Sequence, residues 1–280
     1  MSATRTVARD GNAVTFVVAV SSTGNWSAGK PASAKRSILE TNFLASPCLQ
    51  GPHPHQILLQ EDFPSAGRAY NDAIDKSVND LIVFCHQDMF FPEPWISQLQ
   101  QSCEWLDAKD PQWGVIGCSG ITPERQMRGY VYSPGLGIVG NTSEPGEVQT
   151  LDEIVLAFRK SSGLRFDENL PHFHFYGADI CLQAAERGMK SYAISAFCIH
   201  NTYANFSLPS EFYECCGHIR KVWKKALPIQ TTCVSITRAN LPVYMRRLRQ
   251  FYVKHIRREE HEFKRVDDVR RVFEEISGRI

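Results

Sequence analysis

The sequence lacks the paired cysteines and several of the short motifs that identify metal, phosphate and hydrolase sites. Its nine cysteines include no C-x-x-C pair, and neither a G-x-x-x-x-G-K-[ST] loop nor a G-x-S-x-G elbow occurs. These absences count against zinc ribbons, P-loop phosphate chemistry and Ser-His-Asp catalysis. Because the cysteine count is odd and no secretory signal opens the chain, we expect reduced thiols and a cytoplasmic location.

Long apolar runs and an excess of charge are also missing. The longest apolar runs, 13–20 and 81–85, are far too short to span a bilayer. The formal net charge of the 280 residues is only +1, so nucleic acid is not an expected partner. The charge is unevenly placed, however, because residues 218–280 carry 16 Lys and Arg against 7 Asp and Glu. The sequence therefore combines an acidic body with a basic C-terminal part.

Strand and helix patterns alternate over most of the chain. Runs of β-branched and apolar residues predict strands at 14–20, 56–60, 81–85, 114–117, 148–158 and 191–199. Helical spacing predicts helices at 37–44, 65–76, 95–106 and 179–187. Residues 120–146 are rich in glycine and proline and predict loops and hairpins. The alternation indicates an α/β fold with a mostly parallel sheet.

Two predicted strands end at a histidine. His86 follows strand 81–85, Asp88 stands two residues later, and His200 ends strand 191–199. Ligands of open α/β sheets bind at the carboxyl ends of strands, and residues two apart on an extended chain face the same way. A carboxylate suits Mg²⁺, and imidazole shifts the preference toward Mn²⁺. The structural alternative is a hydrogen-bonded His86, Asp88 as a helix N-cap, and a packed His200.

Asp179 is a third candidate, because it begins the predicted helix 179–187 after a Gly-Ala turn. One interpretation makes it a catalytic carboxylate. The other is structural, since a carboxylate at a helix N-terminus is stabilised by the helix dipole. The aromatic residues before it, Phe173, Phe175 and Tyr176, either wall a pocket or fill a core.

Two segments resemble the family 2 glycosyltransferases. The first, SAGRAYNDAIDKSVNDLIVFCHQDMFF (65–91), is similar to the nucleotide-sugar-binding core, in the subgroup with His-Gln-Asp in place of Asp-x-Asp. The second, FDENLPHFHFYGADICLQAAERGMKSYAISAFCIHN (166–201), looks like the acceptor-side segment. The resemblance covers residues 14–200. It implies a GT-A-type three-layer fold with a mostly parallel mixed central sheet, a nucleotide-diphosphate sugar donor, Mn²⁺ or Mg²⁺, and usually inversion at the anomeric carbon.

The resemblance also implies roles for individual residues. It makes His86, Asp88 and His200 the metal ligands and Asp179 the base that deprotonates the acceptor hydroxyl, with Asp167 and Glu168 in reserve. The expected donor contacts are Val20, Ser21, Arg68, Asn71 and Gln87. One departure concerns the base, because the family often has a Glu-Asp pair before the helix, where this chain has Tyr176 and Gly177.

The predicted domains are a glycosyltransferase domain at 1–210 and a basic, mainly helical extension at 211–280. The Gln-x-x-Arg-Trp signature of processive synthases is absent, which favours transfer of a single sugar. A glycan, a lipid-linked molecule or a protein remain open as acceptors. Two other functions also remain open: a non-catalytic nucleotide-sugar or glycan-binding module, and a metal-dependent phosphoesterase or nucleotidyltransferase.

The basic extension contains an amphipathic pattern. Tyr244, Leu248, Phe251 and Tyr252 recur at helical spacing among many Lys and Arg residues. Such a helix lies on an anionic membrane surface, packs on the body of the protein, or pairs two subunits as a homo-oligomer.

Overall fold

The computed structural model describes residues 13–20, 38–50, 55–141, 144–202, 204–205, 208–257, 262–263 and 265–279, so Ser21 lies outside the described residues. Residues 38–41 are helical, and the further α-helices are α2 (Ala66–Lys76), α3 (Trp95–Lys109), α4 (Tyr176–Glu186), α5 (Ser210–Val222), α6 (Leu241–Tyr252) and α7 (Val269–Ile276). No helix among these residues is both long and apolar enough to cross a membrane.

The central sheet has seven strands in the order β2-β1-β3-β11-β5-β12-β9. Their bounds are β1 (Thr15–Val20), β2 (Gln56–Glu61), β3 (Leu81–Cys85), β5 (Val115–Gly117), β9 (Gly146–Val148), β11 (Val155–Arg159) and β12 (Ser191–Ala193). Five strands run in one direction, while β11 and β9 run antiparallel to their neighbours. The expected mixed and mostly parallel sheet is therefore confirmed.

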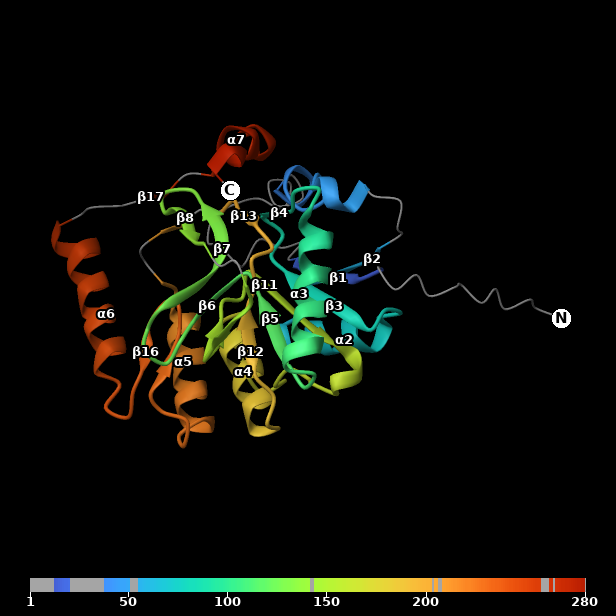
Figure 1. The fold of residues 1–280 in the computed structure, drawn as a ribbon. Coiled ribbons are helices and arrows are strands. Elements are labelled where there is room, and N and C mark those ends of the chain that lie inside the picture. The colour runs from blue at the N-terminus through green and yellow to red at the C-terminus, as the bar shows by residue number, and fades with distance from the viewer. Residues whose placement is uncertain are drawn as a thin grey trace.

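Successive side chains of the central strands point to opposite faces of the sheet and pack into two separate hydrophobic cores. On one face, Val17 of β1 and Phe84 of β3 pack with residues of α2, α4 and α5. On the other face, Val18 and Val83 pack with residues of α3. Figure 1 shows the resulting three layers, with α3 in front of the sheet and α4 and α5 on its other side. The period of two along each strand produces this arrangement.

A second sheet brings distant segments together beside the first. Its order is β10-β6-β7-β13-β4, with β8 paired to β7. The strands are β4 (Met89–Phe90), β6 (Ser119–Ile121), β7 (Met127–Ser133), β8 (Gly137–Gly140), β10 (Thr150–Leu151) and β13 (Cys198–His200). Because β13 pairs antiparallel with β4, His200 lies opposite Met89. This register places the end of β13 next to the chain that leaves β3.

Three local predictions were wrong in detail. The segment 148–158 is not one strand but contributes to β9, β10 and β11, and 191–199 divides into β12 and β13. Helix α4 begins at Tyr176, three residues before Asp179.

Gly135, Gly137 and Gly140 have the G-x-G-x-x-G spacing of a dinucleotide-binding turn. They belong to the β7–β8 hairpin, and no helix begins there. The spacing therefore does not indicate a dinucleotide-binding site.

The C-terminal part is mainly helical, as expected, and it packs into the main core. Phe212, Ile219 and Trp223 around α5 belong to the same buried cluster as the strands of the central sheet. So do Ile229 and Ile236, which come from the hairpin of β15 (Ile229–Gln230) and β16 (Ser235–Ile236). The predicted boundary at 210/211 therefore does not coincide with a break in packing. The remaining described pair joins β14 (Ala204–Asn205) to β17 (Glu262–Phe263).

Candidate metal and donor site

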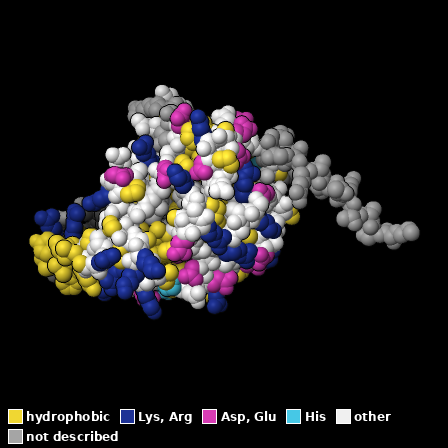
Figure 2. Space-filling model, turned by 60° about the horizontal axis from the view of Figure 1, so that its bottom comes forward, with side chains coloured by type: hydrophobic (Ala, Val, Ile, Leu, Met, Phe, Trp, Pro, Cys, Tyr) yellow, Lys and Arg dark blue, Asp and Glu magenta, His cyan; other side chains and the backbone are white. Residues whose placement is uncertain are grey.

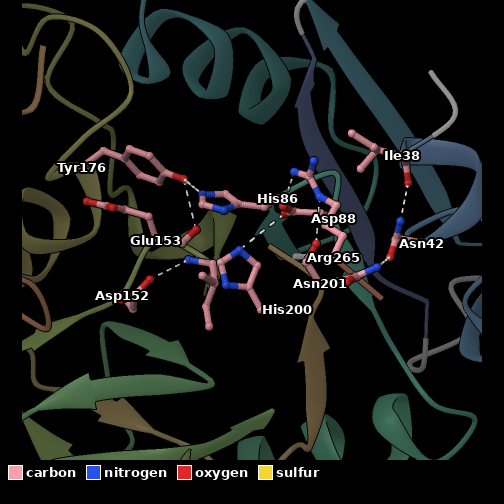
Figure 3. A network of polar contacts seen from close by, with 11 residues as sticks. Ile38, Asn42, His86, Asp88, Asp152, Glu153, Tyr176, His200, Asn201 and Arg265 are labelled. Atoms are coloured by element: carbon pink, nitrogen blue, oxygen red, sulfur yellow. Dashed lines mark hydrogen bonds and ion pairs between the residues drawn. The ribbon is translucent and has the colours of Figure 1, made fainter. Parts of the chain in front are cut away.

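Two histidines and a carboxylate converge where β3 and β13 end (Figure 3). His86 directly follows β3, Asp88 directly precedes β4, and His200 is the last residue of β13. One ligand atom from each of the three side chains lies within 4.8 Å of the others. The structure thus brings together the three predicted metal ligands, although 112 residues separate Asp88 from His200 in the sequence.

Backbone pairing fixes this geometry. The N–H of Asn201 donates to the carbonyl of Asp88 at 2.8 Å, which extends the β4–β13 ladder to the site. The imidazole Nε2 of His200 lies 3.4 Å from Oδ1 of Asp88, and the His86 and His200 ring centroids are 5.5 Å apart. Asp88 is only 6% exposed, so its charge is shielded from bulk water.

The charges around the site keep Asp88 ionised. Burial alone raises the pKa of this carboxyl, but the charges of His200, His86 and Arg265 and a hydrogen bond from His200 lower its pKa far below the ordinary value. Burial, followed by the charge of His200, lowers the pKa of His86. An ionised carboxylate and a neutral imidazole are the forms that bind metal ions.

Tyr176 determines which nitrogen of His86 is available. The Tyr176 hydroxyl donates to the backbone carbonyl of Glu153 at 3.0 Å, so its oxygen is left to accept from Nε2 of His86 at 3.1 Å. This assigns the proton of the ring to Nε2 and a lone pair to Nδ1. In Figure 3 the second ring nitrogen faces His200 and Asp88. A hydrogen bond of this kind commonly orients a metal-binding histidine.

Arg265 is a site residue that sequence reasoning missed. Its Nη2 lies 3.1 Å from Oδ2 of Asp88, and its Nε donates to the carbonyl of Asn201 at 2.9 Å. Asn201 binds the backbone of Val266 in both directions, at 2.9 Å each. The same side chain donates to Asn42 at 2.8 Å, which ties the C-terminal segment to the body. Figure 3 shows this chain of contacts on one side of Asp88.

The residues present fit a divalent ion. Ligands about 2.0–2.2 Å from a shared ion lie at most about 4.4 Å apart. The observed span of up to 4.8 Å therefore needs only a small closure. Gln87, between the two ligands, has a buried Oε1 that makes no hydrogen bond within the described residues. An orphaned acceptor of this kind suggests a missing group, because buried polar atoms are normally satisfied.

The other predicted donor contacts lie at varying positions. Val20 ends β1, whose register with β3 places it at the same sheet edge as Gln87. Arg68 is exposed on α2. Asn71 is buried and uses its amide on Phe166, through both Nδ2 and Oδ1 at 3.0 Å, and on Glu168 at 3.0 Å. Through these hydrogen bonds Asn71 joins α2 to residues 166–168. Its role in donor binding stays a prediction.

Asp179 has the contacts of a structural carboxylate. It is 1% exposed, accepts from the indole Nε1 of Trp223 at 2.6 Å, and accepts from Nε2 of Gln183 at 2.7 Å. Burial raises its pKa, while these two hydrogen bonds lower it. Asp179 lies in the first turn of α4 but does not begin it, and its two hydrogen bonds come from side chains of Trp223 and Gln183. The catalytic role of Asp179 stays a prediction without a geometric observation in its favour.

Glu153 is the second site residue that sequence reasoning missed. It lies in the turn between β10 and β11, and its carboxyl accepts from the backbone N–H groups of Phe175 and Gly177 at the start of α4. Burial and then the charge of Asp152 raise its pKa to about 8, against the lowering effect of those two hydrogen bonds. Figure 3 shows its side chain running alongside the Tyr176 ring.

Comparison with known proteins gives distant likenesses. No protein-family model matches the chain. A curated relative, "ATP synthase subunits region ORF 6" of Fuscovulum blasticum, is 34% identical over 127 residues, which cover 43% of this chain and 50% of the relative. The chain therefore matches about half the length of this curated relative.

Two of the similar solved structures contain nucleotides. A mannosyltransferase from Pyrobaculum calidifontis, in complex with GDP-Man and Mn²⁺, shares 13% identity with a TM-score of 0.41, covering 85% of this chain and 69% of its own. TarS 1–349 from S. aureus, in complex with UDP, shares 10% identity with a TM-score of 0.47, covering 88% and 73%. Identities of 13% and 10% indicate a likeness of fold only.

Proposed function

We propose that this chain is a glycosyltransferase of the GT-A type, which transfers a single sugar from a nucleotide-diphosphate sugar with the help of a divalent ion. The observation that carries the proposal is the convergence of His86, Asp88 and His200 at the carboxyl ends of two strands. These residues lie in the two segments whose sequence resembles family 2 glycosyltransferases. Two imidazoles and one carboxylate favour Mn²⁺ over Mg²⁺.

The chain's own residues prepare the donor side. Asp88 remains ionised in a buried position, and the Tyr176 hydrogen bond turns Nδ1 of His86 toward the other ligands. A divalent ion held there supplies positive charge to the donor diphosphate, whose negative charge grows as the sugar leaves. Arg265, 3.1 Å from Asp88, adds a second cation at the same place. Such fixed charges favour the departure of the nucleoside diphosphate.

The proton of the acceptor hydroxyl needs a carboxylate, and Glu153 meets this need better than Asp179. A Cβ added at Gly177 would lie 3.3 Å from Cγ of Glu153. Glu153 thus brings an acidic group beside a position where the resembled family often carries one and this chain has none. It is partly exposed, whereas Asp179 is sealed by Trp223 and Gln183. A pKa of about 8 also gives Glu153 the basicity suited to a general base near neutral pH.

A thermal-shift panel tests the donor site. UDP, GDP, CDP and dTDP are each added with Mn²⁺, with Mg²⁺ or with EDTA. A ligand at 100 times its Kd stabilises the fold by about 2.7 kcal/mol, which is readily measured. We expect one nucleotide to stabilise the protein only with metal, and Asp88→Ala to abolish the effect while Glu104→Ala, at an exposed acid on α3, retains it. If no nucleotide stabilises the protein under any condition, the donor site does not exist.

A non-catalytic nucleotide-sugar-binding module is the second candidate, favoured by the engagement of both Asp179 oxygens in internal hydrogen bonds. Product analysis separates the candidates. A transferase releases intact nucleoside diphosphate when acceptor is present, whereas a binding module releases nothing. A phosphoesterase with the same ligands would instead release nucleoside monophosphate and sugar phosphate, and a nucleotidyltransferase would transfer the nucleoside monophosphate to a second substrate.

A further inference from the structure

Helix α6 and the π-helical turn that follows it (Val253–Arg257) carry a row of large apolar side chains in solvent. Their exposed fractions run from 48% for Tyr252 to 70% for Leu248. The members of this row, called here the α6 stripe, are Leu241, Tyr244, Met245, Leu248, Phe251, Tyr252 and Ile256. Figure 2 shows them as one apolar patch at the end of the molecule where Figure 1 places α6. Contiguous exposed patches of this kind mark interaction sites.

The stripe is held outward by the opposite face of the helix. Val243 is 5% exposed and belongs to the main core. Gln250 binds the backbone of Leu208 in both directions, at 2.8 and 3.1 Å, and accepts from the Tyr213 hydroxyl at 2.8 Å. These anchors fix the rotation of α6. The interpretation in which Leu248 and its neighbours pack on the body is therefore wrong for the described residues.

Cations border the stripe. With 100° per residue within α6, Arg249 lies along one edge of the stripe and Arg247 along the other, where its guanidinium lies 5.4 Å from the centre of the Tyr213 ring. Lys254 follows in the π-helical turn. Residues 241–257 contain no Asp or Glu at all. Figure 2 shows Lys and Arg side chains around the apolar patch. An apolar face with basic flanks is the pattern of a helix lying in the plane of a membrane interface.

We propose that the α6 stripe docks this protein on an anionic membrane surface. The apolar side chains enter the boundary between headgroups and acyl chains, and the flanking Lys and Arg stems reach back to lipid phosphates. A second copy of the chain is a poorer occupant, because helix pairing would bring Arg247, Arg249 and Lys254 close to the same cations without any acid on the helix to offset them. Anionic lipid supplies the missing negative charge.

A pocket of about 470 Å³ opens beside the same helix. Pro242 and Arg246 of α6 line it together with Arg125 and residues of the β15–β16 hairpin. Thr232, in the turn of that hairpin, donates to Asp152, the residue next to Glu153. Docking through the α6 stripe would therefore place this basic pocket close to lipid headgroups. The lining of this pocket includes no residue of the candidate site, and membrane binding does not depend on the proposed transferase function.

Vesicle co-sedimentation of the full chain tests the proposal. Vesicles of phosphatidylcholine alone are compared with vesicles that also contain phosphatidylglycerol. We expect binding only to the second kind, weakened by salt because the surface charges are screened. The variant Leu248→Gln/Phe251→Gln removes two inserted apolar groups and should weaken partitioning by at least about tenfold. The matched control Leu136→Gln changes an equally exposed leucine outside the stripe and should bind like the wild type.

Light scattering during gel filtration measures the molar mass and so tests whether a second copy of the chain binds the α6 stripe instead. A wild-type dimer that the double variant dissociates, without binding to anionic vesicles, would overturn the membrane proposal. So would equal binding of the wild type and the double variant. Circular dichroism of each variant verifies that the surface substitutions leave the fold intact.

Discussion

Replacing Glu153 by glutamine should lower activity and at the same time improve stability at high pH. The carboxyl of Glu153 has a folded-state pKa of about 8, raised first by burial and then by the charge of Asp152. A carboxyl with a raised pKa keeps its proton in the folded protein over a range where the unfolded chain has lost it. The unfolded state then binds fewer protons, so the free energy of unfolding falls as pH rises from about 4.5 to about 8.

The size of this effect follows from the shift. About 3.5 pKa units at about 1.36 kcal/mol each set a ceiling of roughly 5 kcal/mol. Of this, roughly 3 kcal/mol should be lost between pH 5.5 and 9, because the folded carboxyl loses its proton only near pH 8. Glutamine has the shape of the protonated carboxyl and keeps an oxygen for the N–H groups of Phe175 and Gly177. The Glu153→Gln variant should therefore lose this pH dependence.

Urea unfolding at pH 5.5 and pH 9, with Glu104→Gln as an exposed control, measures the difference. Sugar transfer by the same proteins supplies the second readout. We expect a loss of about 10²–10⁴-fold in the transfer rate of Glu153→Gln, with donor binding retained. Wild-type activity should rise with pH through about 8, as the base loses its proton. Parallel pH dependence of stability in wild type and variant, or unimpaired transfer, would refute the assignment of Glu153.

Three further substitutions test the site and its support. Asp88→Asn should abolish metal-dependent stabilisation by nucleotide while changing the melting temperature in EDTA only moderately, as measured by differential scanning fluorimetry. Asp179→Asn should destabilise the fold by about 1–3 kcal/mol in urea, because an amide has one acceptor oxygen for the two donors Trp223 and Gln183, yet it should retain transfer if Glu153 is the base. Gly67→Ala should cost about 1–3 kcal/mol despite the better helix propensity of alanine, because its Cβ would lie 2.3 Å from the carbonyl oxygen of Asp167; unchanged thermal stability would contradict this.

The parts of the site that the sequence predicted follow from sheet geometry. A strand that ends on a polar residue places that residue at the edge where ligands bind. The sequence alone therefore predicts that His86 and Asp88, which follow strand 81–85, lie at this edge. His200 was predicted for the same reason. Its proximity to Asp88 depends on the β4–β13 pairing, in a second sheet that the alternation of strands and helices does not indicate.

The residues that were missed have little local signal. Arg265 is 177 residues from Asp88 in the sequence and is one of many cations in the C-terminal part. Glu153 was hidden because 148–158 alternates like a single strand, although two consecutive acids in the middle of an apolar strand are a sign of a turn. The burial of Asp179 by Trp223 could not be deduced either, since it depends on how α5 ends against α4.

The C-terminal part of the chain contacts acidic side chains of the body. Three acidic residues of the body are engaged by the segment after residue 210: Asp88 by Arg265, Asp152 by Thr232, and Asp179 by Trp223. Removal of that segment would take one partner from each carboxylate, leaving Asp88 with His200 and Asp179 with Gln183, and loss of a partner destabilises a buried carboxylate. The basic C-terminal part is thus a wall of the site as well as the carrier of the α6 stripe. An acidic body that anionic lipid repels and a basic helix that it attracts would together fix how the molecule faces a membrane.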